Sequence, residues 1–167
     1  MARPTFVPGF EHDVFVSYVH VDNRKFDRDV GWVETFVENL REALPQKLKR
    51  GRPDIWRDLR LSSSAPFSDG IRAAVTHSAI LLAILSESSL TSEWCQRELA
   101  FFLEAAEQTG GATGRIFLVR LDALDHNCWP EAFRCLLGQK FFEQAHVDAP
   151  AYTLGTTYST ILLNKPY

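Results

Sequence analysis

Long apolar runs are absent from this 167-residue chain. The longest, Ala79-Ile80-Leu81-Leu82-Ala83-Ile84-Leu85, has seven residues, whereas a helix that spans a membrane needs about 20. No apolar signal segment follows the N-terminus either. We therefore expect no membrane span, no membrane partner and a cytoplasmic location.

Cysteine is scarce, and histidine is scattered. The three cysteines, Cys95, Cys128 and Cys135, show no CxxC spacing and are too few for a disulfide framework, which fits a reducing cytoplasm. The five histidines show no ligand spacing, so we predict no metal site. They are His12, His20, His77, His126 and His146.

Neither sign of charge dominates. The net charge of −3 gives no general attraction to nucleic acid, which we do not expect as a partner. Hydrophobic residues make up 46% and charged residues 23% of the chain, as in ordinary globular proteins. The length suits one domain. We predict an N-terminal tail over 1–10 and a single domain over 11–167.

Apolar patterns alternate between strand and helix periods along the chain. We predict strands over 12–18, 54–57, 79–85, 115–121 and 140–143, and helices over 30–44 (closed by Pro45), 69–77, 92–109 and 130–137, with a last helix starting within 150–163. The wholly apolar strand 79–85 is typical of a central parallel strand. The pattern predicts a doubly wound α/β fold, with a mostly parallel five-stranded sheet in the order 2-1-3-4-5 and helices on both faces.

Ligands of such sheets bind beyond the carboxyl ends of the strands, here between the first and third strands. Chemistry should therefore gather in residues 17–23, 57–68 and 86–88 and at the start of the helix near Ser92. The first turn, residues 17–22, has no glycine, which excludes a dinucleotide-binding turn. Ser86 stands where a phosphoacceptor receiver would need a carboxylate.

Glu98 is the unusual residue of the helix over 92–109. At about 100° per residue, it falls inside an apolar arc, between Trp94 and Phe102. A carboxylate there must be paired, hydrogen-bonded or used in function. From the pattern alone, Glu98 either carries chemistry or only holds loop backbone at the switch point. Cys95 faces the same arc and is expected to belong to the core.

Several motifs in order resemble the Toll/interleukin-1 receptor (TIR) domain family, most closely its bacterial branch. They are Asp13-Val14-Phe15-Val16-Ser17-Tyr18 with Asp22, Ile55-Trp56-Arg57-Asp58, Phe67 with Ile71, Leu85-Ser86, and Ser92-Glu93-Trp94-Cys95-Gln96-Arg97-Glu98-Leu99. The resemblance covers about residues 11–145 and implies the flavodoxin-like fold. The loop after the second strand departs from the family because Ser62-Ser63-Ser64-Ala65-Pro66 lacks the usual glycine.

The resemblance implies two alternative functions. Many bacterial TIR domains cleave the nicotinamide–ribose bond of NAD with the glutamate of a Trp-x-x-x-Glu motif, which Trp94 and Glu98 match. Glu98 would then be catalytic, NAD would be the substrate with no further cofactor, and the products would be nicotinamide and ADP-ribose or its cyclic form. Such an enzyme would act in bacterial antiphage immunity by depleting NAD. The alternative is a non-enzymatic scaffold that signals through other TIR domains or subverts a host; a glycosidase of free nucleosides is a third reading.

The same resemblance suggests which side chains hold the substrate. They are Trp94, Tyr18, Ser17, Asp58, Arg57, Ser86 and Phe67. Trp94 would form an apolar wall, Tyr18 would stack on a ring of NAD, and Arg57 would meet a phosphate, although packing or capping would also explain each position. The resemblance further implies self-assembly with other TIR domains and a fused or partner sensor domain.

Overall fold

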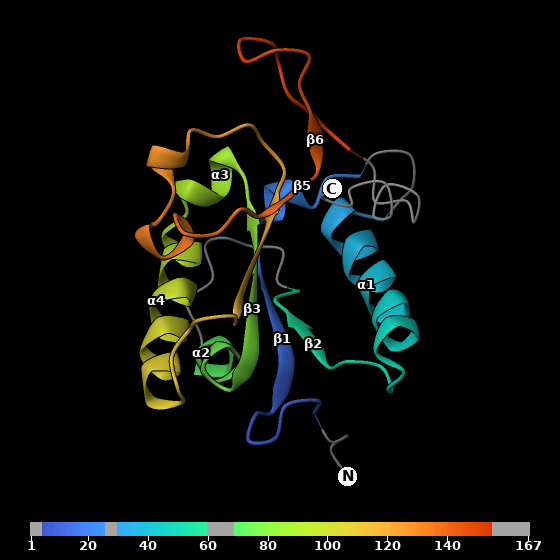
Figure 1. Ribbon diagram of the computed structural model, residues 1–167, viewed down its shortest axis with the longest axis vertical. Coiled ribbons are helices and arrows are strands. Elements are labelled where there is room, and N and C mark those ends of the chain that lie inside the picture. Colours follow the sequence, from blue (N-terminus) through green and yellow to red (C-terminus); the bar gives the residue numbers. More distant parts are fainter. Residues whose placement is uncertain (1–4, 26–29, 60–68, 155–167) are drawn as a thin grey trace.

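The computed structural model describes residues 5–25, 30–59 and 69–154. Its main sheet has five parallel strands in the order β2-β1-β3-β4-β5, so the predicted fold class and strand order are confirmed (Figure 1). The strands are β1 (His12–Ser17), β2 (Ile55–Arg57), β3 (Ser78–Leu85), β4 (Ile116–Arg120) and β5 (Gln139–Lys140). Central β3 pairs with β1 and β4, as its apolar sequence predicts.

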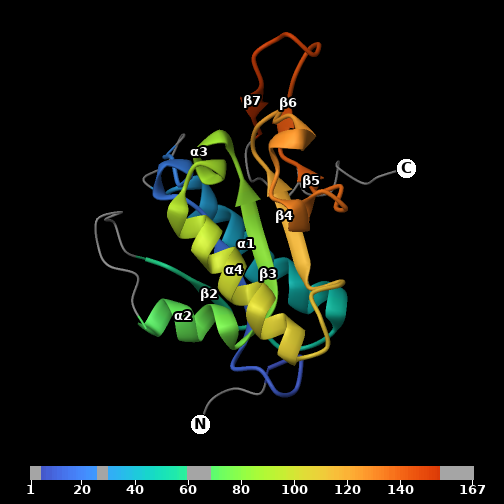
Figure 2. The same ribbon diagram turned by 90° about the vertical axis from the view of Figure 1, so that its left-hand side faces the viewer.

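Helices cover both faces of this sheet. Helix α1 (Trp32–Leu48) packs on one face, and α2 (Asp69–Thr76) and α4 (Glu93–Gln108) pack on the other (Figures 1 and 2). Each interface forms its own apolar core, because alternate residues of a strand point to opposite faces. Within the described residues, no helix is long and apolar enough to cross a membrane.

Helix α4 begins and ends where the sequence predicts. The Ser92 hydroxyl accepts a hydrogen bond from the Cys95 backbone N–H at 3.3 Å, which caps the first turn. At the other end, Gly110 adopts a φ of 94° that a residue with a Cβ would strain to reach. These two signals fix the register of the helix, and with it the position of Glu98.

Helix α1 differs from its prediction because Pro45 lies inside it rather than closing it. A proline inside a helix removes its own backbone N–H and its ring crowds the carbonyl four residues earlier, but its fixed φ is helical, so it need not end the helix. The helix therefore continues to Leu48, and Lys49 ends it in the left-handed conformation with a φ of 52°.

The C-terminal part of the fold is less regular than predicted. In place of a helix over 130–137 there are two 3-10 turns, His126–Cys128 and Glu131–Phe133, which bury Trp129 and Phe133 in the core shared with α4. A short helix, α3 (Glu87–Leu90), was not predicted. Residues 5–10, expected to be a tail, contact the domain: the backbone N–H of Phe6 donates to Asp13 at 2.5 Å.

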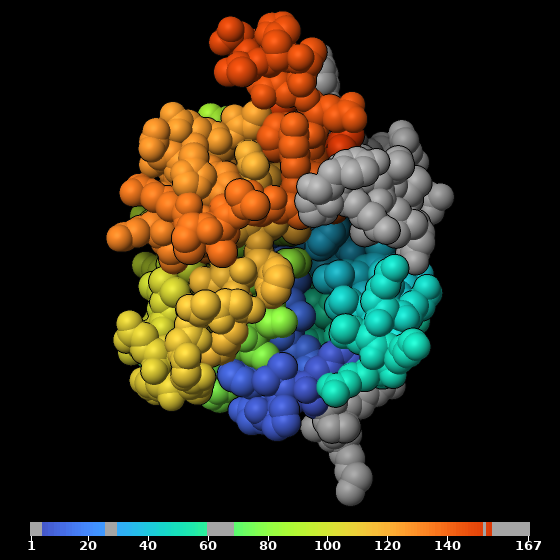
Figure 3. Space-filling view, in the orientation of Figure 1, coloured from blue at the N-terminus to red at the C-terminus, as the bar shows by residue number. Residues whose placement is uncertain are grey.

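The predicted strand over 140–143 splits between two sheets. Lys140 ends β5, whereas β6 (Phe142–Glu143) pairs antiparallel with β7 (Tyr152–Thr153) in a hairpin that projects from the body (Figures 2 and 3). The predicted strand is interrupted at Phe141, which packs in the core on the α1 side of the sheet. The following residue, Phe142, is also buried. Residues 152–153 of the range in which the last helix was expected to start form a strand, and the rest of that range from 155 lies outside the described part.

Candidate active site

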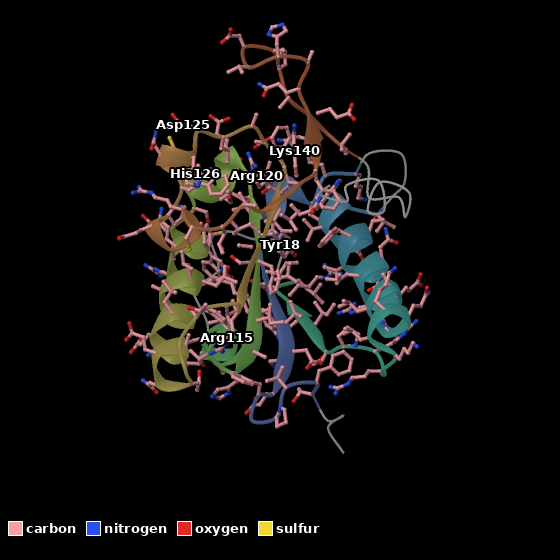
Figure 4. All side chains as sticks on the ribbon, in the orientation of Figure 1. Tyr18, Arg115, Arg120, Asp125, His126 and Lys140 are labelled. Atoms are coloured by element: carbon pink, nitrogen blue, oxygen red, sulfur yellow. The ribbon has the colours of Figure 1, made fainter. Side chains whose placement is uncertain are left out.

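A cavity of about 320 Å³ opens at the carboxyl end of the sheet, at the predicted switch point. Four predicted site residues meet there: Glu98 and Trp94 from α4, Tyr18 after β1, and Asp58 after β2. Figure 4 shows Tyr18 near the middle of the molecule, next to β1. The lining consists of Val16, Tyr18, Val19, His20, Val21, Asp58, Ser88, Ser92, Trp94 and Glu98.

Glu98 is the buried acid of this cavity, with 2% of its surface exposed. The Ser17 hydroxyl at the end of β1 donates to Glu98 Oε2 at 2.5 Å. Burial raises the pKa of Glu98 to about 8, and the negative charge of Asp58 adds to this; hydrogen bonds from Ser17 and Trp94 act in the opposite direction. A pKa of about 8 favours the protonated form of Glu98 near neutral pH, and a nearby cation would favour its ionisation.

Tyr18 and Asp58 form the opposite wall. The Tyr18 hydroxyl donates to the Asp58 backbone carbonyl at 2.5 Å, which joins the ends of β1 and β2. The ring of His20 meets the Tyr18 ring edge-on, with centroids 5.6 Å apart. Burial raises the pKa of the Tyr18 hydroxyl. The hydrogen bond and the ring contact thus hold the Tyr18 ring in a fixed orientation along the cavity wall.

A second pair of a serine and a carboxyl group lies at the same end of the sheet. The Ser86 hydroxyl, at the end of β3, donates to Asp22 Oδ2 at 2.6 Å, and both residues are buried. Burial raises the pKa of Asp22 to about 6, and the charge of Asp122 adds to this shift. Adjacent strands β1 and β3 therefore each end in a serine that holds a buried acid, Ser17 with Glu98 and Ser86 with Asp22.

Three predicted site residues are not part of the cavity lining. Arg57 pairs with Glu34 of α1 at 3.5 Å. Ser17 contacts the site through Glu98, and Ser86 holds Asp22. Phe67 lies outside the described residues.

Sequence reasoning also missed several lining residues, among them His20, Ser88 and Ser92. They fall inside or next to the segments expected to carry chemistry. The only available signal was therefore their position at the switch point, and nothing in their type marked them. Asp22 was likewise not predicted as a site residue, although it belongs to the first TIR-like motif and lies in the segment 17–23.

The site has the chemistry of a single acid beside aromatic and apolar walls. Within the described residues, no group of three or more His, Cys, Asp and Glu could hold a metal ion. Burial raises the pKa of the Cys95 thiol to about 12, so Cys95 is not a reactive thiolate. The arrangement can stabilise a cation, or a positive charge that develops during a reaction, next to Glu98.

Comparison with solved structures finds similar chains, two of which are described here. The TIR domains of the activated Roq1 resistosome, which recognises the pathogen effector XopQ, are 26% identical over 70% of this chain and 60% of theirs, with a TM-score of 0.46. A metazoan TIR-STING receptor from C. gigas is 18% identical over 81% of this chain and 39% of its own, with a TM-score of 0.49. The chain thus spans less than two thirds of these structures. Comparison with curated proteins finds no match.

The family comparison covers most of the chain. The model described as TIR domain matches residues 14–152, a span that includes the first TIR-like motif from Val14, the cavity and the Trp-x-x-x-Glu motif. The chain belongs to the Toll/interleukin-1 receptor (TIR) domain family.

Proposed function

We propose that this TIR domain hydrolyses the nicotinamide–ribose bond of NAD, with Glu98 as its catalytic residue. The observation that carries the proposal is the burial of Glu98 within a cavity that also contains Trp94 and Tyr18. A surface that only contacts other proteins has no need of a buried acid, because burial penalises the charged form. Retaining an acid whose pKa rises to about 8 is instead typical of a reactive site.

The reaction suits a site with one acid. In NAD the nicotinamide ring is a cation, and it leaves as a neutral base when its bond to the ribose breaks. The leaving group therefore needs no proton, so the acid and nucleophile pair of ordinary glycosidases is not required. Positive charge develops on the ribose, and an ionised Glu98 next to it would stabilise that charge.

Substrate binding would itself prepare Glu98. An opposite charge within a few ångströms favours the ionised form of a carboxyl group. The cationic nicotinamide ring would thus lower the pKa of Glu98 from about 8 and generate the carboxylate where it is used. Attack of water on the ribose carbon, with release of one proton to the Glu98 carboxylate or to solvent, would give ADP-ribose; attack by a group of the same nucleotide would give the cyclic form.

The remaining residues would position the substrate. Trp94, four residues before Glu98, would limit water at the reacting bond, and the ring of Tyr18 would stack on an aromatic ring of NAD. Asp58 would hydrogen-bond a ribose hydroxyl. Ser17 would act through Glu98, and Arg57, at the end of β2, would face a phosphate once its contact with Glu34 gives way.

The test is incubation with NAD while free nicotinamide is measured, at low and at high protein concentration. Release that follows the protein supports the proposal. Absence of release at every concentration, from a protein that still self-associates, would favour the non-enzymatic scaffold instead. In a bacterial cytoplasm the activity would serve antiphage defence by depleting NAD, under control of a fused or partner sensor domain.

Replacing Trp94 should distinguish its role in excluding water from the reacting bond from its role in packing the core. Trp94→Ala is expected to lower nicotinamide release and to reduce stability by about 3–5 kcal/mol, because half-buried Trp94 also packs against the core beneath α4. Trp94→Phe keeps most of the apolar wall and should recover much of both. Thermal melting has to accompany the assay. A Trp94→Ala protein with full activity would remove Trp94 from the site.

The activity should also depend on assembly. A cavity of about 320 Å³ is at the lower end of the roughly 300–1,000 Å³ of small-molecule sites, so it would take only the reacting end of a dinucleotide. A second TIR domain would supply the remaining contacts, and clustering would raise its effective concentration. Nicotinamide release per mole of protein should therefore rise with protein concentration or with fusion to an oligomeriser.

The loop after β2 is the expected contact, so Phe67→Ala and Pro66→Asp should weaken this rise. Both residues lie outside the described part of the chain. Light scattering on the same samples measures the association. A rate per mole that stays constant for a protein that remains monomeric would show that one domain holds a complete site.

A further inference from the structure

Two cations lie next to each other at the carboxyl ends of β4 and β5. Arg120 and Lys140 are register partners of these parallel strands, and both precede the projecting hairpin (Figure 4). Like charges on neighbouring strands repel and cost stability. Arg115, by contrast, sits at the opposite end of β4 and is used structurally, because its guanidinium donates to the Ala79 backbone carbonyl at 2.7 Å.

The fold holds Arg120 in place through the aliphatic part of its side chain and through contacts of its guanidinium with two aromatic rings. The Arg120 side chain passes over Gly138, where an added Cβ would come within 2.9 Å of Arg120 Cδ, and Gly138 has a φ of 68°. The guanidinium carbon then lies 5.0 Å from the centre of the Trp129 ring and 5.5 Å from that of Phe142. Both rings are buried, so Arg120 is a preformed, partly desolvated cation.

The guanidinium of Arg120 has a buried donor that is not satisfied within the described residues. This donor is Nε, which is buried without a hydrogen-bond partner among them. Ring contacts satisfy the faces of a guanidinium but leave its in-plane N–H donors without acceptors. Among the described residues, the other buried donor without a partner is the indole N–H of Trp129, the ring that Arg120 contacts.

Arg120, Lys140 and Phe142 border a cavity of about 530 Å³ that shares no residue with the Glu98 cavity. Its lining is Arg120, Ala123, Leu124, Asp125, Lys140, Phe142, Gln144 and Val147. The one acid, Asp125, already accepts a hydrogen bond from the Asn127 backbone N–H at 2.9 Å as the cap of a 3-10 turn. The cavity therefore combines two cations, one carboxylate, an amide and an apolar wall.

We propose that the cavity between Arg120 and Lys140 binds the phosphoryl group of a small molecule. A phosphoryl group carries negative charge that attracts cations, and its oxygens match the two parallel N–H groups of a guanidinium. The site lies apart from Glu98 and does not rest on NAD cleavage. Leu124, Phe142 and Val147 would contact the carbon portion of the ligand.

The test is calorimetric titration of the protein with inorganic pyrophosphate, in the absence of NAD and at constant ionic strength. Arg120→Met and Lys140→Met should each weaken binding by about tenfold or more, the effect of losing one charged hydrogen bond. Arg120→Lys keeps the charge but loses the paired N–H groups, so its loss should be intermediate. Lys47→Met, which removes an exposed lysine of α1, is the control and should bind like wild type.

Either of two results would overturn the proposal: no binding by the wild-type protein, or equal binding by wild type and both methionine variants. If Arg120→Met fails to fold, the Lys140→Met and Arg120→Lys variants still decide the outcome, because Lys140 is exposed and its replacement should not disturb the fold. Because NAD is not present, failure here leaves the proposed hydrolysis untouched. Conversely, pyrophosphate binding by a protein that releases no nicotinamide would support this site alone.

Discussion

Glu98→Gln is expected to lower the rate of nicotinamide release by about 10²-fold or more, the scale of losing one key electrostatic group at a reaction centre. Glutamine preserves the size of the side chain and can still contact the Ser17 hydroxyl. It cannot carry the negative charge that stabilises the developing positive charge on the ribose. The measurement is nicotinamide release at several NAD concentrations, which separates a fall in kcat from a rise in KM.

Glu104→Gln is the matched control because Glu104 lies on the exposed face of the same helix. It makes the same carboxyl-to-amide change on the same helix without touching the cavity, so its rate should equal that of wild type. Near-wild-type release by the Glu98→Gln protein would show that Glu98 is only a structural acid. Unfolding curves for both variants ensure that a lost rate is not a lost fold.

The sequence was sufficient to predict the sheet because each strand signal agreed with its neighbours. The apolar run 79–85 could only be a buried central strand, and Ser92 with Gly110 bounded the helix that follows. The C-terminal part lacked such agreement. Phe141 and Phe142 read as one strand, yet the chain bends there, and only the tertiary packing of Phe141 against the α1 side decides this.

The sequence likewise predicted some features of the candidate site and missed others. Helical periodicity placed Glu98 among apolar residues, since the register of α4 was fixed by its cap. The partners of Asp22 and Arg57 could not be predicted in this way. Asp22 meets Ser86, 64 positions away, and Arg57 turns toward Glu34 of α1. Such contacts depend on how loops and helices pack after the sheet has formed, which local patterns do not record.

Glu98 should also destabilise the folded domain in a pH-dependent way. Burial raises its pKa from 4.5 to about 8, so between these values the folded state retains a proton that the unfolded state releases. Stability then falls as pH rises, by up to about 1.4 kcal/mol per pH unit for a single group. Below 4.5 both states are protonated, and above about 8 both are ionised, so the loss is confined to this window.

Glu98→Gln removes the titrating group, and the free energy of unfolding of the variant should therefore exceed that of wild type by an amount that grows from pH 4.5 to about 8 and then stays constant. The difference between the two proteins cancels the separate contribution of Asp22, whose pKa rises to about 6. Urea unfolding at a series of pH values measures it. Glu104→Gln should show no such growth, because Glu104 is exposed.

If Glu98→Gln is more stable than wild type at pH 8 and yet inactive, Glu98 lowers the stability of the fold while it supports activity. Such a trade-off between stability and activity is common at active sites. If instead the two unfolding curves stay parallel across the window, Glu98 ionises freely in the folded protein. The cavity would then be open to water, and a nicotinamide cation would gain little from meeting a carboxylate that is already charged and solvated.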